Sequence, residues 1–351
     1  MNIIVDTDCG FDDIFALSLI DLCPNLNITL ISTVDGINNK IDGYNTMKTL
    51  FSSSMYSSKP LVICGQENFN DSKLNTIDWI SSYKTLLSQF TNNMIKPEVT
   101  VFQSTINNME LTQAIPTVIK KDELNILLCL GPLTNISAVL RTNPTLFTEN
   151  NISRIVLMGG TLEASSGLPD NAEFNFYLDP QAIYDVLHYS DVTIEIIPLD
   201  ICNLTSAEYN QTNNNDKNNT NTIDTTTNIQ NNPSPKEIIR YLYDFYPDSA
   251  SYDSIAAFYL SKPEAFKMKI RDVMVDSITG RLDTTDAGSS GMHGYIPDEI
   301  VAGVQSSSTS TGSSNSSSDK ICTEQNTTKV LIAVEFDHLL YREYLNTILL
   351  S

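Results

Sequence analysis

Short apolar segments alternate with amphipathic stretches along most of the chain. The apolar segments are rich in Ile, Leu and Val and have the length of buried strands, at residues 3–5, 28–34, 61–64, 124–130, 154–158, 192–197 and 330–334. Helical patterns lie between them, at residues 12–22, 41–51, 110–119, 135–141 and 180–188. Strands that alternate with helices predict βαβ units. We therefore expect an α/β protein with a mainly parallel central sheet, doubly wound with helices on both faces.

Two polar segments interrupt this pattern. Residues 209–235 are dominated by Asn and Thr, and residues 305–328 by Ser and Thr. Neither segment has enough apolar side chains to bury a face, so both are expected to be surface insertions. A helical pattern at 234–245 and an apolar run at 330–334 then resume the alternation. These features predict a single domain over residues 1–351 that carries the two insertions.

The overall charge restricts the partners. The formal net charge is −21, which argues against nucleic acids and anionic membrane surfaces, because both are bound through clustered Lys and Arg. No apolar run reaches the roughly 20 residues that span a bilayer. The apolar fraction of 41% is sufficient for a globular core. We expect no nucleic-acid partner and no membrane partner.

The cysteines indicate a reducing environment. They are scattered without a CxxC pair, at Cys9, Cys23, Cys64, Cys129, Cys202 and Cys322. Several lie inside apolar runs, which favours reduced core residues over a disulfide framework or a zinc site. The first residues have the pattern of a strand followed by an acidic turn, unlike a signal peptide. A cytoplasmic location is therefore expected.

Four carboxylates lie within residues 6–13 (DTDCGFDD). Asp6 and Asp8 follow an apolar strand and point the same way, while Asp12 and Asp13 fall on the first turn of the next helix. Carboxylates this crowded repel one another unless a cation sits among them or one takes up a proton. A helix cap with a solvated acidic turn would explain Asp12 and Asp13 but not Asp6 and Asp8. The motif therefore predicts a site for a hard cation, Ca²⁺ or Mg²⁺.

Further polar residues lie where later strands end, which is where ligands bind in open α/β sheets. Residues 128–135 (LCLGPLTN) form a strand-to-helix turn with exposed backbone carbonyls, which are suitable calcium ligands. On this segment alone, an ordinary turn capped by Thr134 or Asn135 is the better interpretation. Asp253 opens an apolar helix, where an N-cap is again the simpler interpretation. A turn at 279–281 (TGR) precedes a late strand.

Another polar group follows the strand that ends in MGG at 158–160. Within EFNFYLDP at 173–180, Glu173 and Asn175 bracket an aromatic residue, and both could hydrogen-bond a polyhydroxylated ligand. Asp179, which precedes a proline, is expected to cap the next helix and to have a structural role.

Together these motifs resemble one enzyme family. DTDCGFDD closely resembles the DTDPGxDD signature of the nucleoside hydrolases, the inosine-uridine-preferring N-ribohydrolases. Further segments match in order: TVDG at 33–36, Asn45, LGPLTNI at 130–136, LMGG at 157–160, AEFNFYLDPQA at 172–182, PLD at 198–200 and YDSIAA at 252–257. The resemblance covers the chain apart from the two insertions and residues 66–101. It implies the fold of that family and calcium-dependent hydrolysis of the N-glycosidic bond of a ribonucleoside, to ribose and free base.

The resemblance also assigns roles to residues, position by position. It implies a bound Ca²⁺ held by the side chains of Asp8, Asp13 and Asp253 and by the backbone carbonyl of Leu130. Asp6 would brace the loop, and Asp8 would also be the general base that deprotonates water. The remaining matched residues would contact the sugar of the nucleoside substrate: Asp12, Glu173, Asn175 and Met158. Because dimers and tetramers are common in the family, the resemblance also allows a homo-dimer or a homo-tetramer.

The chain departs from the family pattern on the side of the leaving base. Many members have His where this chain has Tyr252, and that His is the usual candidate for protonating the base. A phenol, with a reference pKa of about 10, is a poorer acid near neutral pH. Ile37 and Cys9 replace an Asn and a Pro of the family motifs. The histidines match no motif position: His188, His293 and His338. Tyr252 is therefore the residue expected at the leaving-group side.

Two alternatives remain at this stage. A family member that binds calcium and ribosides with weak or no turnover is favoured by Tyr252. A phosphatase of the haloacid dehalogenase type also begins with a strand that carries an Asp-x-Asp pair. That phosphatase would need a small hydroxyl residue, a Lys and a second acidic pair at later strand ends, and it leaves AEFNFYLDP unexplained.

Overall fold

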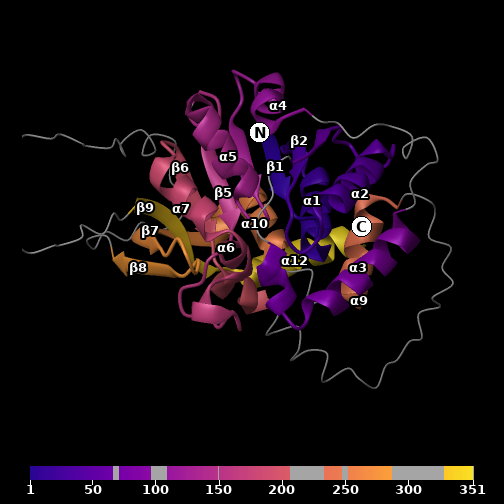
Figure 1. Cartoon of the computed structure of the whole chain (residues 1–351). Coiled ribbons are helices and arrows are strands. Elements are labelled where there is room, and N and C mark those ends of the chain that lie inside the picture. The colour runs from indigo at the N-terminus through magenta and orange to yellow at the C-terminus, as the bar shows by residue number, and fades with distance from the viewer. Residues whose placement is uncertain are drawn as a thin grey trace, which may run out of the picture.

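The central sheet is seen in a computed structural model that describes residues 1–65, 71–95, 109–148, 150–205, 233–246, 252–286 and 328–350. Within these ranges, nine strands form one sheet in the order β3-β2-β1-β4-β5-β6-β9-β7-β8. Figure 1 shows β7, β8 and β9 at the end of the molecule away from β1 and β2. Neighbouring strands from β3 through β6 to β9 run parallel, and β7 and β8 add an antiparallel edge. The predicted α/β fold with a mainly parallel sheet is confirmed.

The seven strands predicted from apolar runs are all present in the described chain. They are β1 (Asn2–Thr7), β2 (Asn27–Thr33), β3 (Leu61–Cys64), β4 (Asn125–Cys129), β5 (Arg154–Met158), β6 (Thr193–Ile197) and β9 (Thr328–Phe336). Ile3 and Val5 belong to the core on one face of the sheet and Ile4 to the core on the other. Because helices cover both faces, these strands have continuous apolar runs in place of alternation.

The strands β7 (Phe266–Val275) and β8 (Leu282–Asp286) extend the sheet beyond β9. The apolar runs did not predict β7, and only the turn at 279–281 pointed to β8. Lys267, Lys269 and Arg271 interrupt the apolar residues of β7. These charges are tolerated because several residues of this strand are only partly buried.

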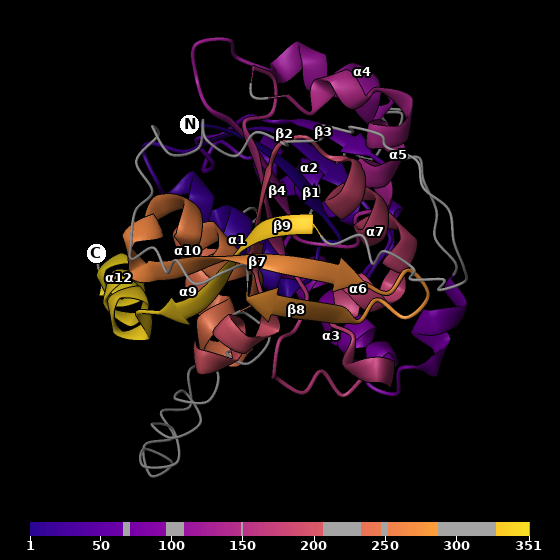
Figure 2. The same ribbon diagram turned by 90° about the vertical axis from the view of Figure 1, so that its left-hand side faces the viewer.

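Helices cover the two faces of the sheet. One face packs against α1 (Phe11–Asp21), α2 (Lys40–Ser52), α3 (Ile80–Met94), α9 (Pro235–Phe245), α10 (Tyr252–Ser261) and α12 (His338–Leu350). The other face packs against α4 (Leu111–Val118), α5 (Thr134–Thr142) and α7 (Pro180–Tyr189). Figure 2 shows α5 and α7 across the sheet from α1 and α10. The predicted doubly wound arrangement is therefore present, and α3 and α12 are helices that the sequence patterns missed.

Short helical segments complete the described elements. They are η1 (Asp71–Thr76), η2 (Pro144–Leu146), η3 (Pro169–Asn171), α6 (Phe174–Leu178), η4 (Pro263–Ala265) and an additional helical segment at 199–205. Two of them, η1 and α6, are joined by Lys73, whose Nζ donates to the Tyr177 carbonyl at 2.6 Å and lies 4.7 Å from the centre of its ring.

The two predicted insertions end slightly earlier than expected. Ser234 caps α9 by accepting from the Glu237 N–H, and α9 begins at Pro235, so these residues belong to the helix. Thr328 is already the first residue of β9. Residues 209–232 and 305–327 lie outside the described residues. Because β9 pairs with β6, the chain after the second insertion returns to the same sheet.

Two observations bear on the surroundings of the protein. In the described ranges, none of the helices combines the length and the apolar character needed to cross a membrane. Five cysteines fall within these ranges, and all five are free thiols: Cys9, Cys23, Cys64, Cys129 and Cys202. Cys322 lies outside the described residues.

The sheet order reverses between β1 and β4. The chain moves from β1 outward to β2 and β3, whereas β4, β5 and β6 follow on the opposite side of β1. At such a switch point the loops after the two central strands turn in opposite directions and leave a crevice beyond the carboxyl ends. Asp8 follows β1 and Leu130 follows β4, so the predicted site lies at this crevice.

Candidate functional site

The acidic loop of residues 8–10, which joins β1 to α1, turns sharply at Cys9. Cys9 has a φ of 60°, in the left-handed region, and its N–H donates to Thr7 Oγ1 at 3.1 Å. The Gly10 N–H donates to Asp13 Oδ2 at 2.8 Å, and the Thr7 hydroxyl also donates to Asp13. These bonds hold the loop and orient the Asp13 carboxylate at the start of α1.

Asp6 and Asp8 have different surroundings although they are two residues apart. Asp6 is fully buried and does not line the cavity. Its carboxylate accepts hydrogen bonds from the Ser32 hydroxyl and from Asn135 Nδ2 at 2.9 Å. Burial raises the pKa of Asp6 to about 7. Asp8 lines the cavity and accepts the Ile37 N–H at 2.8 Å. Asp6 therefore ties β1 to β2 and α5 beneath the loop, while Asp8 faces the space where a ligand would lie.

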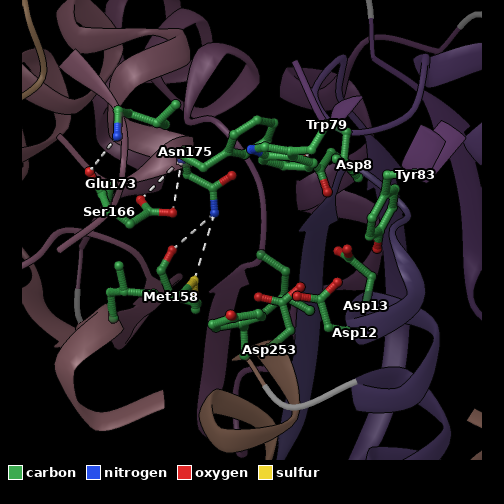
Figure 3. Close-up of a pocket in the computed structure, with 16 residues that line it drawn as sticks. Asp8, Asp12, Asp13, Trp79, Tyr83, Met158, Ser166, Glu173, Asn175 and Asp253 are labelled. Atoms are coloured by element: carbon green, nitrogen blue, oxygen red, sulfur yellow. Dashed lines mark hydrogen bonds between the residues drawn. The ribbon is translucent and has the colours of Figure 1, made fainter. Parts of the chain in front are cut away.

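Asp253 brings a fourth carboxylate to this group from α10. Carboxylate oxygens of Asp12, Asp13 and Asp253 lie within 4.8 Å of one another, and Asp8 lines the same cavity (Figure 3). Burial, together with the charges of the neighbouring carboxylates, raises the pKa of Asp8, Asp12 and Asp253. Burial also raises the pKa of Asp13. Four such carboxylates cannot all be ionised unless a cation offsets their charge.

The residues of this group fit a hard cation. The described residues that line the cavity include no Lys, Arg or His that could neutralise the carboxylates. Leu130 lines the cavity just after β4, and its N–H donates to the Asp6 carbonyl at 2.8 Å. A donor set made of carboxylate and carbonyl oxygens is the kind that Ca²⁺ prefers. Asp12, which the resemblance assigns to the sugar, lies in the tight carboxylate group and could contact either the cation or the sugar.

The cavity has a volume of about 360 Å³, which suits a small molecule. Its lining combines the carboxylates with apolar side chains and aromatic rings. The lining residues are Asp8, Asp12, Asp13, Ile37, Trp79, Tyr83, Leu130, Met158, Ser166, Leu168, Glu173, Phe174, Asn175, Leu199, Tyr252 and Asp253. Apart from Asp6, which lies beneath the acidic loop, the site residues predicted from the sequence all line this one cavity.

Met158, Glu173 and Asn175 form one side of this cavity. Glu173 is the N-cap of α6, and its carboxylate accepts the Asn175 N–H at 3.0 Å and the Gly160 N–H at 3.1 Å. Asn175 Nδ2 donates to the Met158 carbonyl at 3.3 Å, as the dashed lines in Figure 3 show. The Glu173 carboxylate thus holds backbone groups in place while it also faces the cavity.

The buried Glu173 carboxylate is expected to make stability depend on pH. Burial raises its pKa from 4.5 to about 7, although hydrogen bonds from backbone N–H groups act in the opposite direction. Between these values the folded state binds a proton that the unfolded state lacks, so stability falls as pH rises through this window. We expect wild type to lose about 3 kcal/mol more than Glu173→Gln between about pH 4.5 and 8. Urea unfolding of both proteins at several pH values measures this difference, and parallel profiles would contradict it.

Two simple cap interpretations of the sequence are wrong, and one is confirmed. α10 begins at Tyr252, so Asp253 lies inside the helix and is directed to the cavity with 2% exposure. Thr134 and Asn135 do not cap α5, because the Thr134 hydroxyl donates to Asp179 at 2.7 Å and Asn135 donates to Asp6. Asp179 does cap α7, where it accepts the Ala182 N–H at 3.1 Å.

The aromatic side of the cavity was not predicted from the sequence. Tyr83 on α3 accepts the Phe11 N–H through its hydroxyl at 2.9 Å, which brings α3 against the start of α1. Trp79 is 48% exposed, and its ring centre lies 5.6 Å from that of Phe174. The signals were the single Trp of the chain and the apolar spacing of α3, within a stretch that matched no motif.

None of the described histidines reaches the cavity. His188 lies on α7, where its ring stacks on Tyr184 at 4.0 Å between centres, and His338 begins α12. His293 lies outside the described residues. Tyr252 instead lines the cavity beside Asp253, at the position where a His is expected from the resemblance.

Comparison with known proteins defines the class. The family model of the inosine-uridine preferring nucleoside hydrolases matches residues 3–339. The chain therefore belongs to the inosine-uridine preferring nucleoside hydrolase family. The motif resemblance and the expected fold are both confirmed.

Individual relatives are more distant. The chain is 30% identical over 222 residues to the non-specific ribonucleoside hydrolase RihC of Klebsiella pneumoniae, a match that covers 60% of this chain and 65% of that protein. It is 31% identical over 200 residues to the pyrimidine-specific ribonucleoside hydrolase RihA of Photobacterium profundum, with 57% and 60% of the two chains covered. The chain thus matches less than two-thirds of the length of these relatives. The crystal structure of an inosine-uridine preferring nucleoside hydrolase from Bacillus anthracis superposes with a TM-score of 0.64 at 18% identity, over 99% of this chain and 98% of that one.

Proposed function

We propose that this protein is a calcium-dependent nucleoside hydrolase that cleaves the N-glycosidic bond of ribonucleosides, to ribose and free base. The observation that carries the proposal is a group of four carboxylates, from the buried Asp8, Asp13 and Asp253 and the partly buried Asp12, in a cavity whose described lining has no basic side chain. Membership of the nucleoside hydrolase family supports the same chemistry. The phosphatase alternative does not hold, because the chain belongs to this family.

The carboxylates suit the charge that develops in this reaction. As the base departs, positive charge builds on the ribose, and buried negative groups stabilise it. Bound Ca²⁺ would supply Lewis acidity and offset the charge of Asp8, Asp13 and Asp253, with the Leu130 carbonyl as a further ligand. Met158, Glu173, Asn175 and Asp12 are placed to hold the sugar.

Asp8 is the proposed general base. Water forms a bond from its oxygen to the anomeric carbon, its proton passes to the Asp8 carboxylate, and the bond from that carbon to the base nitrogen breaks. The departing base takes up a proton from solvent at its nitrogen, and Asp8 returns the proton of the attacking water to the solvent. Tyr252 lines the cavity on α10 and is the residue that we assign to the leaving-group side.

The lining also restricts the substrate class. Five carboxylates face the cavity, from Asp8, Asp12, Asp13, Glu173 and Asp253, and the described lining offers no cation to a phosphate. Neutral ribosides are therefore favoured over nucleotides. Trp79 and Phe174 offer aromatic surface to a base, and stacking of this kind tolerates different bases. Since the two relatives have different base preferences, their preferences are not carried over to this chain.

Ribose release from a panel of purine and pyrimidine nucleosides, with their 5′-monophosphates as controls, tests this proposal. We expect release from at least one nucleoside and much slower release from the matching nucleotide. Absence of release from every nucleoside, by folded protein supplied with calcium, would refute the proposed activity.

We also propose that the protein acts in a reducing compartment, because its described cysteines are free thiols.

A second candidate function, riboside binding with weak or no turnover, is favoured by Tyr252. General acid catalysis contributes about 10²–10⁴-fold, and an imidazolium is a much better acid than a phenol near neutral pH.

We expect Tyr252→His to raise ribose release from inosine by about tenfold or more. Tyr252→Phe is the matched control and should change release little. If Tyr252→Phe instead abolished release, the phenol itself would be the acid.

A further inference from the structure

The loop of residues 161–171, between β5 and α6, forms one wall of the cavity through Ser166 and Leu168. We propose that Asp200 is a positioning residue, which binds the backbone at the start of this loop and thereby keeps Ser166 and Leu168 on the cavity wall. The inference rests on the proposed function for the identity of the ligand, a riboside. Asp200 itself does not line the cavity.

The Asp200 carboxylate collects several donors from the loop. Oδ2 accepts the Leu162 N–H at 2.7 Å, and Oδ1 accepts the N–H groups of Glu163 at 2.7 Å and Ala164 at 2.8 Å. The Thr161 hydroxyl lies 3.3 Å from Oδ2. Hydrogen bonds to an ionised carboxylate are shorter and stronger than those between neutral groups. One side chain therefore fixes three consecutive peptide N–H groups.

Both partners of this contact are attached to the sheet. Asp200 follows β6 at the start of the helical segment 199–205, and the loop follows β5. The Leu199 N–H donates to the Gly160 carbonyl at 2.9 Å, which continues the pairing of β5 with β6 beyond their ends. Asp200 is thus placed on rigid backbone directly beside the segment that it binds.

The same loop is held at its far end by Asn171. Asn171 Oδ1 accepts the Ser166 N–H at 2.9 Å, and its Nδ2 donates to the Ala164 carbonyl at 2.9 Å. The Leu168 N–H donates to Ser166 Oγ at 3.1 Å. Because Asn171 binds to Ala164, the end of the loop contacts the same segment that Asp200 binds.

Leu168 connects this wall with the aromatic side of the cavity. Leu168 packs against a small apolar cluster that includes Leu74 of η1, Ile77 just after η1, and Ile80 at the start of α3. Loss of the Asp200 contacts would therefore loosen a wall that meets the aromatic side of the cavity. Neither Ser166 nor Leu168 is part of the proposed chemistry, so the effect should fall on binding and leave the chemical step intact.

The test compares Asp200→Ala and Asp200→Asn with Asp21→Ala as a matched control. Asp21 has the same kind of contacts with a different loop, because its carboxylate accepts the N–H groups of Ser57 at 2.8 Å and Ser58 at 2.7 Å. Asp21 does not line the cavity. Hydrogen-deuterium exchange of residues 162–166 and steady-state ribose release, separated into KM and kcat, are measured for all three variants and wild type.

Asp200→Ala is expected to speed exchange at 162–166 and to raise KM about tenfold, with kcat changed by less than about threefold. Asp200→Asn keeps one acceptor oxygen and should fall between wild type and Asp200→Ala. Asp21→Ala should lower stability without changing KM. The proposal would be overturned if Asp200→Ala lowered stability but had the same KM and the same exchange rates at 162–166 as the control. A loss of kcat at constant KM would also overturn it.

Failure of the proposed function gives a different result. If wild type releases ribose from no nucleoside, the hydrolase proposal is refuted while the exchange measurement still decides the role of Asp200. Faster exchange at 162–166 in Asp200→Ala than in Asp21→Ala then supports positioning of the wall, and equal exchange contradicts it. Should Asp200→Ala fail to fold, the same comparison is made with Asp200→Asn.

Discussion

Replacing Asp8 by Asn is expected to reduce ribose release by about 10²–10⁴-fold, which is the usual effect of losing a general base. The reduction should be larger if the substitution also weakens metal binding. The amide cannot accept the proton of water and brings no negative charge to the carboxylate group. Its oxygen can still accept the Ile37 N–H, which Asp8 accepts at 2.8 Å, so the loop should keep its fold. Turnover at saturating nucleoside, measured beside thermal unfolding and metal content, gives the result.

Asp35→Asn is the matched control for this substitution. Asp35 lies nearby, accepts the Lys40 N–H at 2.9 Å and pairs with its ammonium group at 3.6 Å, but does not line the cavity. It should retain turnover. An Asp8→Asn protein that is folded, loaded with calcium and close to wild-type turnover would refute the assignment of Asp8 as the base.

Removal of calcium is expected to produce the second large effect, a loss of stability. A ligand that binds only the folded state stabilises it by about 4 kcal/mol when its free concentration is about 1,000 times Kd. A bound cation would also relieve repulsion among the crowded carboxylates of Asp8, Asp12, Asp13 and Asp253, whose pKa values burial raises. The midpoint of thermal unfolding should therefore fall when wild type is transferred from calcium to a chelator.

Asp253→Asn separates binding of the cation from other effects of the chelator. It removes one buried negative charge, so the metal-free variant should be at least as stable as metal-free wild type. Calcium should stabilise this variant much less, because a ligand is missing. If calcium shifts the unfolding midpoints of wild type and Asp253→Asn equally, the carboxylates do not form the calcium site.

Much of the sheet could be predicted because the central parallel strands, β1 and β4, are buried along their whole length and on both faces. Such strands are continuous apolar runs, as at Ile3, Ile4 and Val5, and these are recognisable without knowledge of their partners. β7 escaped because it is only partly buried and carries basic residues. Its place in the sheet follows from pairing with β9, a contact between segments that no local pattern reveals.

The acidic part of the site could be predicted because its residues are concentrated in one motif. Asp8, Asp12 and Asp13 are close in sequence, and Asp253 was found only through the match of YDSIAA to the family. The walls of the cavity could not be found in this way. Tyr83 lies on α3 and Trp79 just before it, in a stretch without a recognised motif, and Leu168 comes from a loop whose shape depends on Asp200.

Cys9 shows what motif matching leaves out. The family motif has Pro at this position, but Cys9 has a φ of 60°, which a proline ring cannot adopt. The acidic loop of this chain therefore takes a backbone path that the signature itself would exclude. The identity of the surrounding acids could be transferred from the motif, whereas the geometry of the turn required the structure.

Calcium-dependent ribose release tests the central claim most directly. The protein is stripped with a strong chelator, its metal content is determined by elemental analysis, and release from a cleaved nucleoside is measured as calcium is returned. We predict that release is lost in the stripped protein and returns in proportion to bound calcium. A metal-free protein that still releases ribose at the full rate would contradict the claim.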